Sequence, residues 1–160
     1  MDLMDHIKGF MNTKLKELSE ELAEKYSVPE NEVEDVVLGF LRDTYGPAQN
    51  MAETISRKDK PVLLFIWREG CAICQKSKPE LEKFIQVHSD VDLVMVDYSD
   101  PEGLLYHMIN QKENGMLPMI AMIFQGDIKV EFTGECIHPE VYEKYYKDLL
   151  VQCSQNIYAF

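Results

Sequence analysis

The chain has 160 residues, of which 46% are hydrophobic and 28% charged, so it can supply the packed core of one soluble domain. Its 28 acidic residues outnumber 16 Lys and Arg residues, and the formal net charge is −12. Such a surface repels phosphate backbones and anionic lipids, which disfavours nucleic-acid and membrane partners. No apolar run approaches the roughly 18 residues of a membrane span, and no signal-like segment opens the chain, so we expect a cytoplasmic protein.

Three helices are predicted before residue 60. The first covers Leu3 to Tyr26, where apolar residues recur at steps of three and four. The second follows a break at Pro29, carries an apolar stripe from Val33 to Leu41 and stops near Gly46. A third, short helix is expected from about residue 48 to 57. The first two form a helical hairpin.

Strands and helices alternate after residue 60. Four apolar segments predict strands: Pro61–Trp67, Leu93–Tyr98, Met119–Phe124 and Ile128–Phe132. A turn containing Gly126 joins the last two strands as a hairpin. The intervening segments predict helices from the cysteine pair to about His88, from Pro101 through Lys112, and from Pro139 to about Gln152. This order favours an α/β fold with a central mixed sheet flanked by helices.

One close cysteine pair, Cys71 and Cys74, lies where the first buried strand gives way to a helix. Unpaired N–H groups at a helix start stabilise negative charge, so Cys71 can hold a thiolate at neutral pH. Thiolates in such settings have pKa values of about 3.5–7.5, against about 8.5 for a free cysteine. Cys74 follows one helical turn later, within reach for a disulfide. The pair is therefore a candidate redox dithiol.

Two other interpretations of the pair remain open. Zinc sites use the same C-x-x-C spacing, and Cys136 with His138 could complete four ligands, although the overall spacing matches no known zinc motif. The pair could also serve only packing. We expect neither a metal nor a cofactor. We expect Cys136 to be a small buried or half-buried residue or, alternatively, a regulatory thiol, and we expect Cys153 to serve packing.

The segment around the pair resembles the active site of the thioredoxin family. A Trp lies four residues before the first cysteine, a Glu two before it, and a Pro five after the second: Trp67, Glu69 and Pro79. Downstream, Met116-Leu117-Pro118 resembles the family's cis-proline loop, and glycines follow that proline at eight and sixteen residues, Gly126 and Gly134. The resemblance covers about residues 47–152 and implies a thioredoxin-like fold.

The resemblance also implies roles for individual residues. Cys71 is the nucleophile, Cys74 resolves the mixed disulfide, and Pro118 follows a cis peptide bond beside them. Met116 and Leu117 offer backbone groups to an extended substrate. The remaining candidates for substrate contact are Trp67, which also suits a core position, and Gly70.

Several positions depart from the family pattern. Phe65 stands where the family has a buried Asp that accepts a proton from the resolving cysteine, which leaves Glu69 as the nearest carboxylate in sequence. Gly70 replaces the Trp that usually precedes the first cysteine, and Ala72-Ile73 replaces the usual Gly-Pro. Helices fill the region of the family's first strand.

These observations favour a thiol-disulfide oxidoreductase that acts on protein disulfides, serves cell redox homeostasis and receives electrons from a separate reductase. We divide the chain into a helical extension, residues 1–46, and a thioredoxin-like domain, residues 47–160. The alternative is a binding module whose extension docks a partner, with little turnover. The extension itself could cap the sheet, form a homodimer or bind another protein, since its apolar stripes must pack against something.

Overall fold

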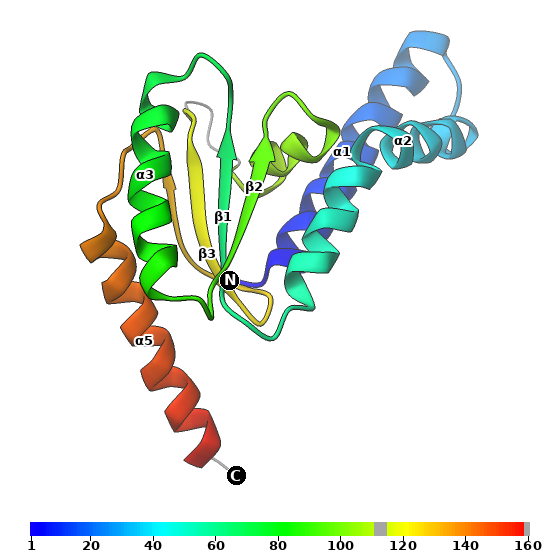
Figure 1. Ribbon diagram of the computed structural model, residues 1–160. Coiled ribbons are helices and arrows are strands. Elements are labelled where there is room, and N and C mark those ends of the chain that lie inside the picture. Colours follow the sequence, from blue (N-terminus) through cyan, green and yellow to red (C-terminus); the bar gives the residue numbers. More distant parts are fainter. Residues whose placement is uncertain (111–114, 159–160) are drawn as a thin grey trace.

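A four-stranded mixed sheet forms the centre of the computed structural model, which describes residues 1–110 and 115–152 and the backbone of 153–158 (Figure 1). The strands are β1 (Val62–Trp67), β2 (Asp92–Asp97), β3 (Met119–Phe124) and β4 (Asp127–Thr133). Their order across the sheet is β2-β1-β3-β4. β1 pairs in parallel with β2, and the β1–β3 and β3–β4 pairs are antiparallel. The predicted mixed sheet is confirmed.

The two central strands, β1 and β3, are buried on both faces. Residues 62–66 of β1 and 119–123 of β3 are each at most 1% exposed, as their continuous apolar sequences require. β2 lies at one edge of the sheet. Among the described residues before β1 there is no strand, only an isolated bridge between Asp2 and Asp127. The expected absence of the family's first strand therefore holds for this part of the chain.

Helices cover both faces of the sheet (Figure 1). They are α1 (Leu3–Tyr26), α2 (Glu30–Ser56), α3 (Ala72–Val87), the 3-10 helix η1 (Pro101–Leu104), α4 (Leu105–Ile109) and α5 (Pro139–Tyr158). One apolar core joins the sheet to α1, α2 and α4, and a second joins its other face to α3 and α5. None of the helices described is long and apolar enough to cross a membrane.

The helix expected to stop near Gly46 continues, so the prediction of a separate helix at about 48–57 was wrong. α2 runs without a break through Pro47 to Ser56. A proline removes one helical hydrogen bond, but the buried residues Ala48, Ala52 and Ile55 keep the same helix face packed on the sheet. The division of the chain after residue 46 stays a prediction, and α2 spans that position.

The helix expected from Pro101 through Lys112 was also partly wrong. It begins as the 3-10 helix η1 and ends as the short helix α4 at Ile109. Asn110 leaves the helical conformation, with φ −94° and ψ 100°, and its side-chain amide donates a hydrogen bond to the Tyr106 hydroxyl at 3.2 Å. Lys112 lies outside the described residues.

The first residues of the chain are tied to the turn between β3 and β4. The Leu3 N–H donates to the Gly126 carbonyl at 2.7 Å, and the Ile128 N–H donates to the Met1 carbonyl at 2.8 Å. The N-terminal amino group also pairs with the Asp127 carboxylate. The hydrogen bond from Lys129, and after it that from the amino group, lowers the pKa of this carboxyl. α1 therefore starts at a fixed point beside the sheet.

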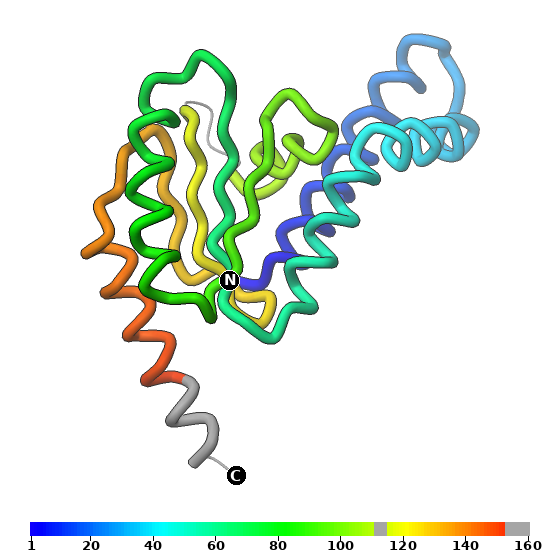
Figure 2. Tube along the Cα trace, viewed as in Figure 1, coloured from blue at the N-terminus to red at the C-terminus, as the bar shows by residue number. Residues whose placement is uncertain are grey.

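The hairpin of α1 and α2 has a base on the sheet and a tip that extends beyond it. At the base, Leu3 and Ile7 are fully buried in the same core as Ala52 and Ile55. Figure 2 shows the tip running away from the sheet, toward the upper right. The base thus covers one face of the sheet, whereas at the tip the two helices pack against each other.

Candidate functional site

The cysteine pair lies at the junction between β1 and α3. β1 ends at Trp67, and a short loop leads to Cys71, which is the N-terminal cap of α3. Gly70, just before it, has φ +78°, a conformation that favours glycine over residues with a side chain. The loop can therefore turn sharply and place Cys71 directly at the start of the helix.

Cys71 and Cys74 form a disulfide, with their Cα atoms 5.2 Å apart. The Cys74 backbone N–H donates a hydrogen bond to Cys71 Sγ at 3.1 Å, so the sulfur caps the first turn of α3. Cys71 is half-buried, whereas Cys74 is only 3% exposed. A reagent from solution can therefore reach the sulfur of Cys71 far more easily than that of Cys74.

The loop before β3 lies beside the disulfide. The Leu117–Pro118 peptide bond is cis, as the resemblance implies, and Pro118 is buried. The Leu117 carbonyl oxygen lies 3.8 Å from Cys71 Sγ. Met116, next to this carbonyl in the chain, is 61% exposed. Cys71, Met116, Leu117 and Pro118 are thus brought together as predicted, while their roles stay predictions.

Gly134 is hydrogen-bonded to this loop through its backbone. Its N–H donates to the Pro118 carbonyl at 2.9 Å, and it has φ +69°. A Cβ atom at this position would lie 2.9 Å from Cβ of Met116, too close for an ordinary contact. The spacing of Gly134 from Pro118 in the sequence therefore corresponds to a close backbone approach beside the disulfide.

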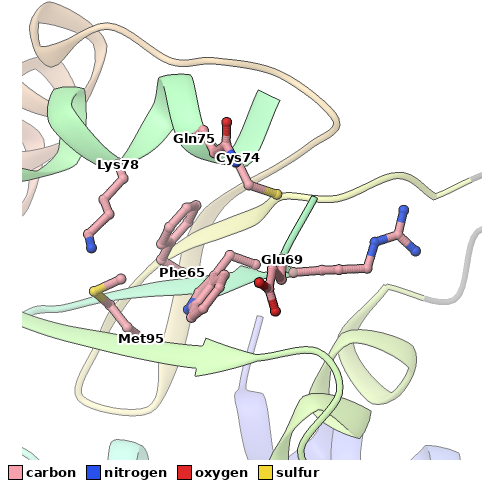
Figure 3. A pocket seen from close by; sticks show the side chains of 8 residues that line it. Phe65, Glu69, Cys74, Gln75, Lys78 and Met95 are labelled. Carbon is pink, nitrogen blue, oxygen red and sulfur yellow. The ribbon is translucent and has the colours of Figure 1, made fainter. Parts of the chain in front are cut away.

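Two pockets flank the disulfide. The first, about 200 Å³ in volume, lies on the Cys74 side (Figure 3) and is lined by Phe65, Trp67, Arg68, Glu69, Cys74, Gln75, Lys78 and Met95. The second, about 320 Å³, lies on the Cys71 side and is lined by Arg68, Cys71, Ile73, Tyr98, Tyr106, His107, Gly115, Met116 and Leu117. Arg68 borders both. The second pocket contains Cys71 together with Met116 and Leu117 of the cis-proline loop.

The buried side of the first pocket is apolar. Phe65 is 1% exposed and belongs to the same core as Cys74, so the described structure places an aromatic ring where the resemblance leads one to expect Asp. In Figure 3, Glu69 and Lys78 lie on opposite sides of the pocket, with Phe65 between them. Glu69 and Cys74 line the same pocket, and the role of Glu69 in proton transfer stays a prediction.

The second pocket contains residues that the sequence patterns did not single out. Tyr98 follows β2, and its hydroxyl is 2.7 Å from Nε2 of His107, which belongs to α4. Burial raises the pKa of the neighbouring Tyr106 hydroxyl. Tyr98 directly follows β2, and the cysteine pair follows β1. Because the two strands are parallel, their carboxyl ends meet at one edge of the sheet, and this pairing could have indicated that Tyr98 lies near the cysteines.

The structure shows where the other candidate residues lie, but their roles stay predictions. Trp67 is half-buried in the first pocket, and Gly70 is exposed in the loop. Cys136 is half-buried and forms no disulfide with any residue whose side chain is described. The side chain of Cys153 lies outside the described residues. Within residues 1–110 and 115–152, no three His, Cys, Asp or Glu side chains gather in a way that could hold a metal ion.

Comparisons with known proteins give the same family that the motifs suggested. A family sequence profile, that of thioredoxin, matches residues 44–145, more than half of the chain. The chain is similar to thioredoxin-2 of the malaria parasite, with a TM-score of 0.50 and 17% identity over 57% of this chain and 84% of that one. It is also similar to oxidised mitochondrial thioredoxin 3 of Saccharomyces cerevisiae, with a TM-score of 0.50 and 23% identity over 62% and 87% of the two chains. The search of curated proteins found no match. At these identities the structural likeness shows the fold alone.

Proposed function

Because the chain belongs to the thioredoxin family, we propose that it is a thiol-disulfide oxidoreductase that reduces or exchanges protein disulfides through Cys71 and Cys74. One observation carries the proposal: the disulfide lies at a helix N-terminus, with its outer sulfur accessible and 3.8 Å from the Leu117 carbonyl of the cis-proline loop. The position favours a thiolate at Cys71, because first-turn N–H groups stabilise its negative charge.

The reaction proceeds in two exchanges of sulfur bonds. In the reduced protein, the Cys71 thiolate attacks one sulfur of a substrate disulfide; that S–S bond breaks, and the leaving thiolate takes a proton from water. Cys74 then loses its proton and attacks Cys71 Sγ, which releases the second substrate thiol. The substrate gains two electrons and two protons, and the protein is left with the Cys71–Cys74 disulfide.

The loop before β3 provides a binding surface for the substrate. The exposed Met116 and the Leu117 carbonyl can pair with an extended peptide as one strand pairs with another. Side chains next to the substrate cysteine would enter the pocket lined by Tyr98 and His107. The proposal includes a separate dithiol reductase that returns the two electrons, and action in the cytoplasm, where such reductants keep thiols reduced.

The test is insulin reduction with dithiothreitol as the electron source. The wild-type chain should speed the precipitation of insulin chains above the rate with dithiothreitol alone, and Cys71→Ser should abolish that increase. Cys136→Ser is the matched control, since it removes a thiol outside both pockets and should leave the rate unchanged. A wild type no faster than dithiothreitol alone would contradict the proposal.

A further inference from the structure

The tip of the α1–α2 hairpin carries an apolar groove, here called the hairpin groove. It has a volume of about 290 Å³ and is lined by Leu18, Glu21, Leu22, Val36, Val37 and Phe40. Two of its apolar side chains remain largely in contact with water: Val36 is 68% exposed and Phe40 is 55% exposed. No other part of the described chain covers them.

The exposed groove residues are not needed to hold the hairpin together. The neighbouring residues Val37 and Leu41 are at most 2% exposed and pack the two helices against each other. Val36 and Phe40 lie one helical turn apart and form a second, outward apolar row on α2. An apolar side chain is more stable in an apolar contact than in water. The outward row is therefore available to a partner.

The charges around the groove restrict what that partner can be. Residues 17–43 contain nine carboxylates and two cations, so they account for more than half of the net charge of the chain. All eleven of these charged side chains are exposed, and in this fully described segment only Glu17 is in an ion pair, with Lys14. The segment that forms the groove is therefore strongly negative, and one of its carboxylates, Glu21, lines the groove.

We infer that the hairpin groove binds a cationic amphipathic helix of a partner protein, with apolar side chains against Val36 and Phe40 and Lys or Arg toward the carboxylates. A second copy of this chain fits poorly, because it would bring a segment with the same excess of carboxylates against the groove. An anionic membrane surface is repelled for the same reason. This inference does not depend on the redox activity.

The place of the groove gives such a partner a defined position relative to the disulfide. In Figure 1, the hairpin tip and the loop before α3 both lie at the end of the molecule toward which β1 runs. The N-terminus and the β3–β4 turn lie at the opposite end. A protein docked on the tip is thus held at the end of the molecule that carries Cys71.

The probe is a fluorescein-labelled synthetic helix of about 18 residues, with Leu on one face and Lys on the other, used with the full-length oxidised protein. Its comparator has Glu in place of every Lys. Fluorescence anisotropy should show binding of the Lys peptide that weakens as salt is raised, and no binding of the Glu peptide. No binding of either peptide, or equal binding of both, would overturn the inference.

Variants separate the groove from general attraction to an acidic protein. Phe40→Ser and Val36→Ser, both at exposed positions, should each weaken binding at least about tenfold while circular dichroism stays unchanged. Val87→Ser, at an exposed apolar position at the end of α3, is the control and should bind as the wild type does. Unchanged affinity of Phe40→Ser, or a wild-type dimer that Phe40→Ser dissociates in sedimentation equilibrium, would overturn the assignment.

Discussion

The sulfur of Cys71 accepts a hydrogen bond from the backbone N–H of Cys74 at 3.1 Å, so the two cysteines are linked through the first turn of α3 as well as through their disulfide. In the reduced protein we expect the first-turn N–H groups of α3, that of Cys74 among them, to face the sulfur of Cys71. They stabilise a thiolate there, whereas Cys74 is enclosed in the core between α3 and the sheet.

This relationship predicts a difference in thiol reactivity. In the reduced protein at pH 7, iodoacetamide should alkylate Cys71 about tenfold faster than Cys136, because only Cys71 lies at a helix N-terminus. Cys74 should react slowly because it is buried. Quenched time points analysed by peptide mass spectrometry give the separate rates. Equal rates for Cys71 and Cys136 would mean that the helix start does not activate the sulfur.

A second prediction concerns the proton that Cys74 must lose. Glu69 and Cys74 line the same pocket. The buried side of this pocket is formed by Phe65, which cannot accept a proton. Glu69→Gln should therefore slow release of the mixed disulfide by about tenfold. This is less than the roughly 10²–10⁴-fold that general acid–base catalysis usually contributes, because Glu69 is exposed. Attack by Cys71 should stay at the wild-type rate.

Single-turnover kinetics with a disulfide-linked peptide resolves these two steps for the Glu69 variant. Glu82→Gln is the matched control, since Glu82 is an exposed carboxylate on α3 outside both pockets. If both variants release the peptide as fast as the wild type, water alone takes the proton and Glu69 has no part in the transfer.

A pair of glycine substitutions tests the loop beside the disulfide. Gly134→Ala should destabilise the protein by about 1–2 kcal/mol and lower kcat/KM for insulin, because its φ is +69° and the new Cβ would press on Met116. Gly9→Ala, in the middle of α1 with open space around it, should stabilise by about 0.5–1 kcal/mol and leave kcat/KM unchanged. Urea unfolding and the insulin assay measure both effects. A stabilising effect of Gly134→Ala, or a destabilising effect of Gly9→Ala, would contradict the geometry.

The base of the hairpin should be part of the stable fold. Ile7→Ala should lower the free energy of unfolding by about 2–5 kcal/mol, because Ile7 is a fully buried residue of α1 that packs in the core against the sheet. Val87→Ala, at an exposed position, should change it by less than about 0.5 kcal/mol. A small effect of Ile7→Ala in urea unfolding would show that α1 is an appendage and not a cover of the sheet.

Much of this architecture could be predicted from the sequence because burial leaves a strong pattern. The continuous apolar runs of β1 and β3 identified the central strands, and the change from strand to helix located Cys71. The continuation of α2 through Pro47 could not be predicted in this way. A proline usually interrupts a helix, and only the packing of Ala48 and Ala52 on the sheet, a tertiary effect, outweighs that preference.

The candidate site was predictable only where its residues are close in sequence or share the family's spacing. Tyr98 and His107 reach the second pocket through the parallel pairing of β1 with β2 and the short helix α4, so their proximity to Cys71 depends on the assembled sheet. The exposed row of Val36 and Phe40 was part of an apolar stripe in the sequence. Which members of the stripe face inward followed only from how α1 and α2 pack.

The most direct test of the proposed function is the capture of mixed disulfides. Attack by Cys71 leaves a covalent intermediate, and Cys74, one turn along α3, is placed to release it. Cys74→Ser should therefore hold client proteins as complexes that dithiothreitol cleaves, while Cys71→Ser should hold few or none. Non-reducing gels of complexes isolated from lysate measure this directly. Equal capture by the two variants, or no capture by Cys74→Ser together with a wild type that fails to reduce insulin, would contradict the account.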